Sequence, residues 1–260
     1  MGREGTRESS RRPTLTVPLP RSPRIAGAAL VAVALALAAT SFGLEVARVE
    51  LDANVTRLQQ WFDVDREATV PTWFTAALFL GGAVAVAASN LRPELRARGW
   101  TVLAVVLVVL SLDETVSLHE EIGDQGEELF GDSGLFAAAW VVPGLVFAAV
   151  VATLSLRAVR MLPAATQRLV LAGGALFVAG AAGLEVAGIA LDDTADRIDR
   201  SLPLAAVQTF EELFEMLGLI VFVCAIGSHL SRPSTEPAPA ASSVSNPPSR
   251  ELRDVMLPTA

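Results

Sequence analysis

The sequence predicts an all-α, polytopic membrane protein with six transmembrane helices. Hydrophobic residues make up 52% of the 260 positions and charged residues only 18%. The apolar residues gather in six blocks, each long enough to cross a hydrocarbon layer of about 30 Å at about 1.5 Å per residue. Arginines and acidic residues also fall on alternate connections between these blocks. We therefore expect a multi-pass protein of the cell (inner) membrane.

The predicted spans form one domain, residues 24–230, between two polar tails. The helices are expected at about 25–43, 70–91, 98–117, 135–156, 168–191 and 204–230. The tails, 1–23 and 231–260, are too polar or too rich in Pro, Ser and Ala to bury a core, which predicts disorder. As an alternative for the N-terminus, Ser10–Leu15 resembles a twin-arginine export signal and Ala36–Ala38 a cleavage site.

The distribution of arginine predicts the orientation. Arginines crowd the first tail and the second and fourth connections, at Arg92, Arg96, Arg98, Arg157, Arg160 and Arg168. The first, third and fifth connections are acidic, and the third, from Asp113 to Asp132, holds eight acids and no arginine. Because arginine-rich connections stay in the cytoplasm, both termini are expected there. The six helices then form three hairpins that turn outward.

An internal repeat is suggested by two similar segments. Gly43–Ala47 recurs as Gly183–Ala187, and the same offset aligns Arg92 with Arg232. This pairing predicts a repeat of residues 24–92 and 164–232, in which Glu45 corresponds to Glu185. The alternative is convergence, because apolar sequences resemble one another in composition.

The sixth predicted helix carries three acids in its apolar interior, Glu211, Glu212 and Glu215. Counted from Pro203, Glu211 lies about 12 Å and Glu215 about 18 Å along the helix, close to the middle of the hydrocarbon. At about 100° per residue, Gln208 shares one arc of about 100° with these acids. This polar stripe is expected to face the interior of the bundle.

Acids at the bilayer centre need a compensating interaction. They cost on the order of 2.5–3.5 kcal/mol each, so the three acids together with Glu185 amount to roughly 10 kcal/mol. A bound cation, protons shared between carboxylates, or arginines from the outer connections could offset that cost. A purely structural hydrogen-bonded network is the alternative to a working site. Since intramembrane ionisable residues are functional candidates, we expect a carboxylate-rich metal or proton site in the outer half.

The third predicted helix adds further candidate ligands. On an ideal helix Asp113 and Glu120 share a face with Glu114 beside it, whereas His119 joins them only if the helix breaks near its outer end. Oxygen-rich sets with at most one imidazole suit Mg, Ca, Mn or Fe. The predicted metal ligands are Asp113, Glu114, His119, Glu211, Glu212 and Glu215, with Glu185 or Glu120 as general base and Glu45 and Gln208 as further polar residues of the region.

The composition excludes several functional classes. All 20 basic residues are arginine, so no lysine is present to form a Schiff base. One cysteine and two histidines leave no disulfide within the chain, no cysteine-based zinc site and no pattern of a di-iron bundle. Nucleotide-binding glycine loops are absent, and a net charge of -8 disfavours a nucleic-acid partner.

Three functions fit these patterns. The first is a metal-dependent enzyme that acts on a membrane lipid or another apolar small molecule, because all the carboxylates lie from the midplane outward. The second is a proton- or divalent-cation-coupled transporter, for which midplane acids and repeats are typical. The third is a non-catalytic subunit of a membrane assembly. The substrate, the reaction and the oligomeric state remain open at this point.

Overall fold

The computed structural model describes residues 23–118, 121, 141–194 and 201–231, and every regular element in these ranges is helical. The long elements are α1 (Pro23–Glu50), α3 (Val70–Asn90), α4 (Arg98–Val116), α7 (Val141–Arg160), the continuous series α8 (Ala164–Val178), η2 (Ala179–Leu184) and α9 (Glu185–Thr194), and α10 (Ser201–Leu230). Two short elements, α2 (Thr56–Phe62) and η1 (Pro93–Leu95), lie in connections. Within these described ranges, six helices are long and apolar enough to cross a membrane, which confirms the predicted multi-pass class.

The first span is longer than the apolar pattern indicates. It was expected to end near residue 43, but α1 continues to Glu50 because nothing in Gly43–Glu50 interrupts an α-helix. This extension places Glu45 and Arg48 on the helix rather than in a loop. Apart from Pro23, which begins α1, and Ser231, the predicted disordered tails lie outside the described residues, as do the first six residues of the expected fourth span.

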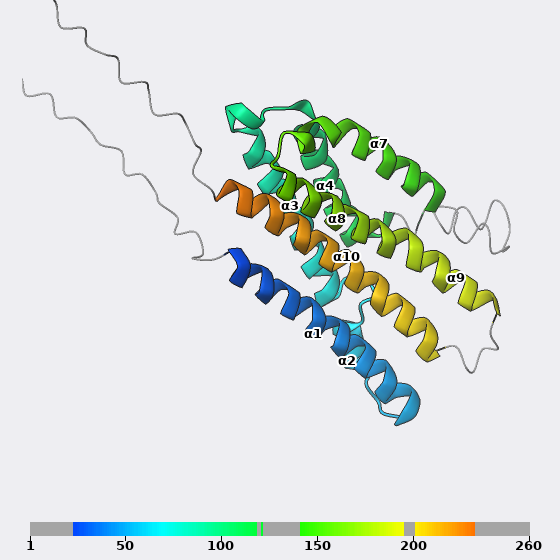
Figure 1. The fold of residues 1–260 in the computed structure, drawn as a ribbon. Helices are drawn as coiled ribbons and strands as arrows, with labels where there is room; N and C mark the ends of the chain where they lie inside the picture. The colour runs from blue at the N-terminus through cyan, green and yellow to red at the C-terminus, as the bar shows by residue number, and fades with distance from the viewer. Residues whose placement is uncertain (1–22, 119–120, 122–140, 195–200, 232–260) are drawn as a thin grey trace, which may run out of the picture.

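Helix α10 is the central element of the bundle (Figure 1). It packs most extensively against α8 and α1, and then against α3, while α4 packs against α3 and α7. Met216, Ile220 and Ile226 of α10 are among the largest fully buried side chains. Because α1 packs on α10 and α3 packs mainly on α4, the first predicted hairpin is not a packed pair of helices. The outward-turning arrangement stays a prediction.

Small residues bring the fifth span against α10. A Cβ on Gly173 would lie 2.7 Å from the Gly218 carbonyl oxygen, and one on Gly218 would lie 2.6 Å from the Gly173 oxygen and from the Phe177 amide nitrogen. Contacts this short to backbone atoms leave no room for a side chain, so the two helices meet backbone to backbone. Phe177 of α8 also packs edge-on against Phe79 of α3, which ties the fifth span to the second.

The segment between α2 and α3 is held by a network of threonines. Thr69 caps α3 by accepting a hydrogen bond from the Thr72 amide, and the hydroxyls of both threonines donate to the Arg66 carbonyl. On the other side of this segment, the Val64 amide donates to Ser41 Oγ of α1. The connection is therefore fixed to both α1 and α3, and Asp63 and Asp65 are held beside the bundle.

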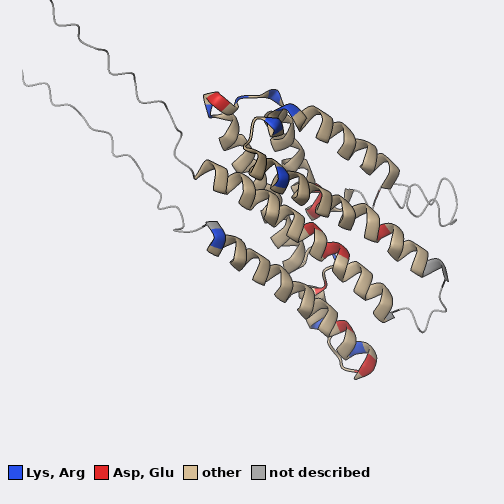
Figure 2. Ribbon diagram, viewed as in Figure 1, with Lys and Arg blue, Asp and Glu red and all other residues tan. Residues whose placement is uncertain are grey.

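The two ends of the bundle differ in their balance of arginine and acidic residues (Figure 2). Arg92 and Arg98 flank the turn between α3 and α4, and Arg157, Arg160 and Arg168 flank the turn between α7 and α8. We call this end of the bundle the arginine end. The opposite end, which holds α2 and the starts of α3 and α10, is called the α2 end.

The two similar segments of the predicted repeat differ in geometry, because α1 is α-helical through Gly43–Ala47 whereas Gly183 and Leu184 are part of the π-helix η2.

Candidate functional site

Carboxyl groups from three spans converge on α10. Glu215 interacts electrostatically with Glu114 and Asp113 of α4, with Glu185 of α9 and with Glu211 of its own helix. Glu212 interacts with Glu215, Glu114 and Glu211. We refer to Asp113, Glu114, Glu185, Glu211, Glu212 and Glu215 as the carboxylate cluster. The residues predicted as ligands on two separate helices are thus brought together, and Glu185 joins them.

The carboxyl groups of Glu185 and Glu211 lie within hydrogen-bonding reach of each other. An ionised carboxylate only accepts hydrogen bonds, so a bond between two carboxyl groups forms when one of them is protonated. Glu212 and Glu215 are half-buried within the protein alone, on a helix that spans the membrane by length and composition. If several of these carboxyl groups were ionised together, they would repel one another strongly in this environment.

The fifth span changes its helical form beside the cluster. Ala179–Leu184 is a π-helix, and Glu185 follows it directly. A Cβ on Gly180 would lie 2.8 Å from the Glu211 carbonyl oxygen and 3.2 Å from Glu215 Cγ, so this glycine is what allows the π-helix to touch the acids. Isolated π-helical turns occur frequently at functional sites because they redirect the side chains that follow. Here the side chain that follows is Glu185.

The third span ends just beyond the cluster. Helix α4 stops at Val116, and Ser117 takes a left-handed conformation with φ 53°. The ideal-helix face that was expected to continue from Asp113 to Glu120 is therefore interrupted. His119 and Glu120 themselves lie outside the described residues. Within the ranges that are described, no three His, Cys, Asp or Glu side chains lie close enough to hold one metal ion.

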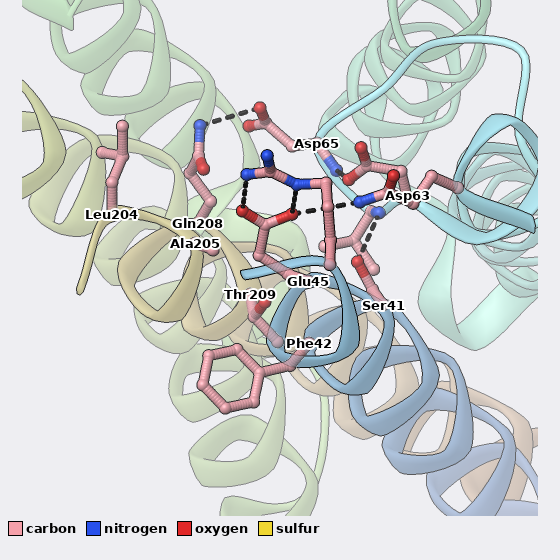
Figure 3. A pocket seen from close by; sticks show the side chains of 12 residues that line it. Ser41, Phe42, Glu45, Asp63, Asp65, Leu204, Ala205, Gln208 and Thr209 are labelled. Atoms are coloured by element: carbon pink, nitrogen blue, oxygen red, sulfur yellow. Dashed lines mark hydrogen bonds and ion pairs between the residues drawn. The ribbon is translucent and has the colours of Figure 1, made fainter. Parts of the chain in front are cut away.

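A polar pocket of about 290 Å³ opens between α1, α2 and α10 (Figure 3). Its walls include Glu45 and Arg48 of α1, Gln59 of α2, and Leu204 and Gln208 of α10. Glu45 accepts hydrogen bonds from Arg48 Nε and Nη2 and from Gln59 Nε2, so its charge is already matched. Glu45 and Gln208 were predicted as polar residues of this region, and they line the pocket rather than join the cluster.

Asp65 connects the pocket to the carboxylate cluster. Its Oδ2 accepts a 2.7 Å hydrogen bond from Gln208 Nε2, and its carboxyl group also interacts electrostatically with Glu211 and Glu212 (Figure 3). The sequence did not single out Asp63, Asp65 or Gln59. Arg48 was among the arginines of the outer connections expected to offset the charge of the acids, and it pairs with Glu45. Asp63 and Asp65 lie in an acidic connection before the second span, and nothing in the sequence distinguishes them from other acids in such connections. Their role becomes visible only in the fold, which packs this connection against α10.

Burial raises the pKa of the Asp63 carboxyl group above its usual range. The amide of Asp65 donates to Asp63 Oδ1 and the charge of Arg66 is nearby, and both lower the pKa, whereas Glu45 raises it. The loss of hydration outweighs the other effects. Within the pocket, Asp63 therefore binds a proton more readily than a fully hydrated aspartate does.

Comparisons with known proteins give one match. A family model described as a domain of unknown function, DUF8692, matches residues 26–230, which include all six spans and the cluster. Neither the curated proteins nor the solved structures give a match. Since the family model covers well over half of the 260 residues, the chain belongs to the DUF8692 family.

Proposed function

We propose that this protein binds a cation, either a divalent metal ion or shared protons, in the carboxylate cluster, and that the cation enters through the pocket at the α2 end. The observation that carries the proposal is the convergence of Glu114, Glu185, Glu211 and Glu215 from three membrane-spanning helices. Several ionised carboxylates in a low-dielectric bundle repel one another strongly. A bound cation or proton relieves that repulsion, and the cation-attracting pocket supplies a route.

The position of the pocket favours use of the cation at one membrane face. Asp65 and Gln208 join the pocket to the cluster at the α2 end. Toward the arginine end, α10 continues with Ile220, Phe222 and Ile226, which are buried apolar residues. A site open on one side suits a metal-dependent enzyme that acts on a lipid or another apolar molecule. Arginine at the opposite end supports placing the α2 end outside the cell.

Cation binding can be tested on the purified full-length protein. Metal analysis and Mn²⁺ titration would compare the natural sequence with a variant in which Glu211, Glu212 and Glu215 are replaced by Gln. The matched control is Glu50→Gln, an exposed acid at the end of α1. We expect the triple variant to lose Mn²⁺ binding and the control to retain it. Equal Mn²⁺ occupancy in all three proteins would contradict a metal site in the cluster.

A second candidate, a proton- or divalent-cation-coupled transporter, is favoured by the π-helix η2. A helix that departs from α-geometry in mid-span, next to intramembrane acids, is the kind of element whose rearrangement exposes a site to alternate sides. Proteoliposome uptake separates the two candidates. Accumulation of a divalent ion that depends on pH and is abolished by Glu215→Gln would favour transport, whereas binding without accumulation would favour the enzyme.

A further inference from the structure

Thr75 of α3 carries a buried hydroxyl group that makes no hydrogen bond within the described part of the chain. Its side chain is 0% exposed, and its Oγ1 has no hydrogen-bond partner among the described residues. Elsewhere in the bundle, Thr40, Thr115 and Thr153 donate to the carbonyl four residues earlier in their own helices. A buried polar group without a partner costs about 1–3 kcal/mol, so it calls for an explanation.

The register of three helices places Thr75 at the carboxylate cluster. At Gly82 of α3 an added Cβ would lie 3.4 Å from Leu107 of α4 and 3.6 Å from Phe222 of α10, so the three helices meet there. Seven residues make two helical turns and return to the same face within about 20°. Two turns closer to the α2 end, each helix carries a polar residue on this same face. Thr75 corresponds to Gly82 on α3, Glu114 to Leu107 on α4, and Glu215 to Phe222 on α10.

A hydrogen bond between α4 and α3 supports this register. Ser111 Oγ of α4 donates a 3.0 Å hydrogen bond to the carbonyl of Ala76, the residue next to Thr75, and Ser111 is one turn from Glu114. Glu114 also interacts electrostatically with Glu215. Helices α3, α4 and α10 therefore remain together at this depth, and Thr75 lies on the face of α3 that Gly82 turns toward α4 and α10.

We propose that Thr75 Oγ1 is the third oxygen ligand of a divalent cation held between Glu114 and Glu215. This inference rests on the proposed function, since it assigns the position and the chemical class of the cation. Two carboxylates balance a charge of +2, and a neutral hydroxyl is a hard ligand that Mg²⁺, Mn²⁺ and Ca²⁺ accept alongside carboxylates and water. Such a site needs only two ionisable ligands, which agrees with the lack of a three-residue group within the described ranges.

The test removes the hydroxyl and keeps the shape of the side chain. Mn²⁺ binding to the full-length protein in detergent is measured by electron paramagnetic resonance for the natural sequence, Thr75→Val and Thr75→Ser. Thr153→Val, on the outer helix α7, is the matched control. We expect Thr75→Val to weaken Mn²⁺ binding by about tenfold, the effect of losing one good polar contact. Thr75→Ser and Thr153→Val should bind within about twofold of the natural sequence.

Thermal unfolding without metal provides a second readout. Because Thr75→Val removes an unsatisfied hydroxyl, the unfolding temperature of the metal-free variant should not fall. Retention of full Mn²⁺ affinity in Thr75→Val, together with its loss in Glu215→Gln, would overturn the assignment of Thr75 and leave the proposed function standing. If the natural sequence binds none of Mn²⁺, Mg²⁺ or Ca²⁺, the assignment of Thr75 and the metal-binding form of the proposed function are both overturned. Should the valine variant fail to fold, Thr75→Ala compared with Thr75→Ser decides the same question.

Discussion

At the scale of single residues, the polar groups of the α2 end differ in whether the protein already balances their charge. Glu45 is bound by Arg48 and Gln59, whereas Glu185, the corresponding residue of the predicted repeat, lies among the carboxyl groups of α10. Both glutamates occupy similar local sequences, so the chain alone could not separate them. The difference arises from α2, which supplies Gln59, and from the extension of α1, which supplies Arg48.

Asp63 offers a test of this charge balance by pH. Its raised pKa means that the folded protein holds the proton more tightly than the unfolded chain, so the ionised form costs stability above that pKa. The cost disappears as the pH falls below the ordinary pKa of aspartate. We predict that Asp63→Asn, which keeps the oxygen that accepts from the Asp65 amide, raises the unfolding temperature at pH 7 by up to about 2 °C.

The pH dependence of the difference in unfolding temperature between Asp63→Asn and the natural protein tests this prediction. The advantage of Asp63→Asn should shrink as the pH is lowered and vanish below about pH 4, where both proteins carry an uncharged group. Thermal melts of the two proteins between pH 4 and pH 7 would measure it. An asparagine variant that is less stable at pH 7 than at pH 4, relative to the natural protein, would show that the carboxylate stabilises the pocket instead.

At the scale of elements, the sequence predicts the spans well and their irregularities poorly. The apolar blocks locate all six spans because a helix in a membrane must satisfy its backbone internally and expose apolar side chains. The π-helix Ala179–Leu184 could not be predicted, since its residues are small and apolar like their neighbours. Its position depends on Gly180 meeting α10, which is a tertiary contact.

Gly180 and Gly183 make a matched pair for testing the role of this element. Both lie in η2, but an added Cβ at Gly180 meets the Glu211 carbonyl oxygen at 2.8 Å, whereas at Gly183 nothing lies within 4 Å. We predict that Gly180→Ala lowers stability by about 1–3 kcal/mol, as overpacking does, and weakens Mn²⁺ binding. Gly183→Ala should change neither quantity. Thermal unfolding with and without Mn²⁺ measures both, and equal behaviour of the two variants would contradict the proposed contact between η2 and the cluster.

At the scale of the whole molecule, the charge distribution predicts how the bundle lies in the membrane. Arginine predominates at one end, whereas acids mixed with a few arginines lie at the other (Figure 2). The pocket and α2 are at this second end. The positions of the charged residues in the sequence are enough to predict this asymmetry and to locate the acids of α10. It could not reveal that α1 packs on α10 or that Asp65 returns to the cluster, because both depend on how distant segments pack.

Cysteine labelling tests this orientation. In a Cys224→Ser background, which removes the single native thiol, a cysteine replaces exposed Asn54 at the α2 end or exposed Leu91 at the arginine end. We predict that an impermeant maleimide added to intact cells labels the first protein, and that it labels the second only after the cells are opened. The reverse pattern would place the pocket in the cytoplasm.

The claim that unites these scales is that the carboxyl groups around α10 act as one cation site. Infrared difference spectra of the purified protein, recorded before and after addition of Mn²⁺, test it most directly because they report the protonation of carboxyl groups. We predict that Mn²⁺ converts carboxylic acid absorbance to carboxylate absorbance in the natural protein, and that Glu215→Gln abolishes most of this change. Spectra in which Mn²⁺ leaves the carboxyl absorbance unaltered, or alters it equally in the variant, would contradict the account.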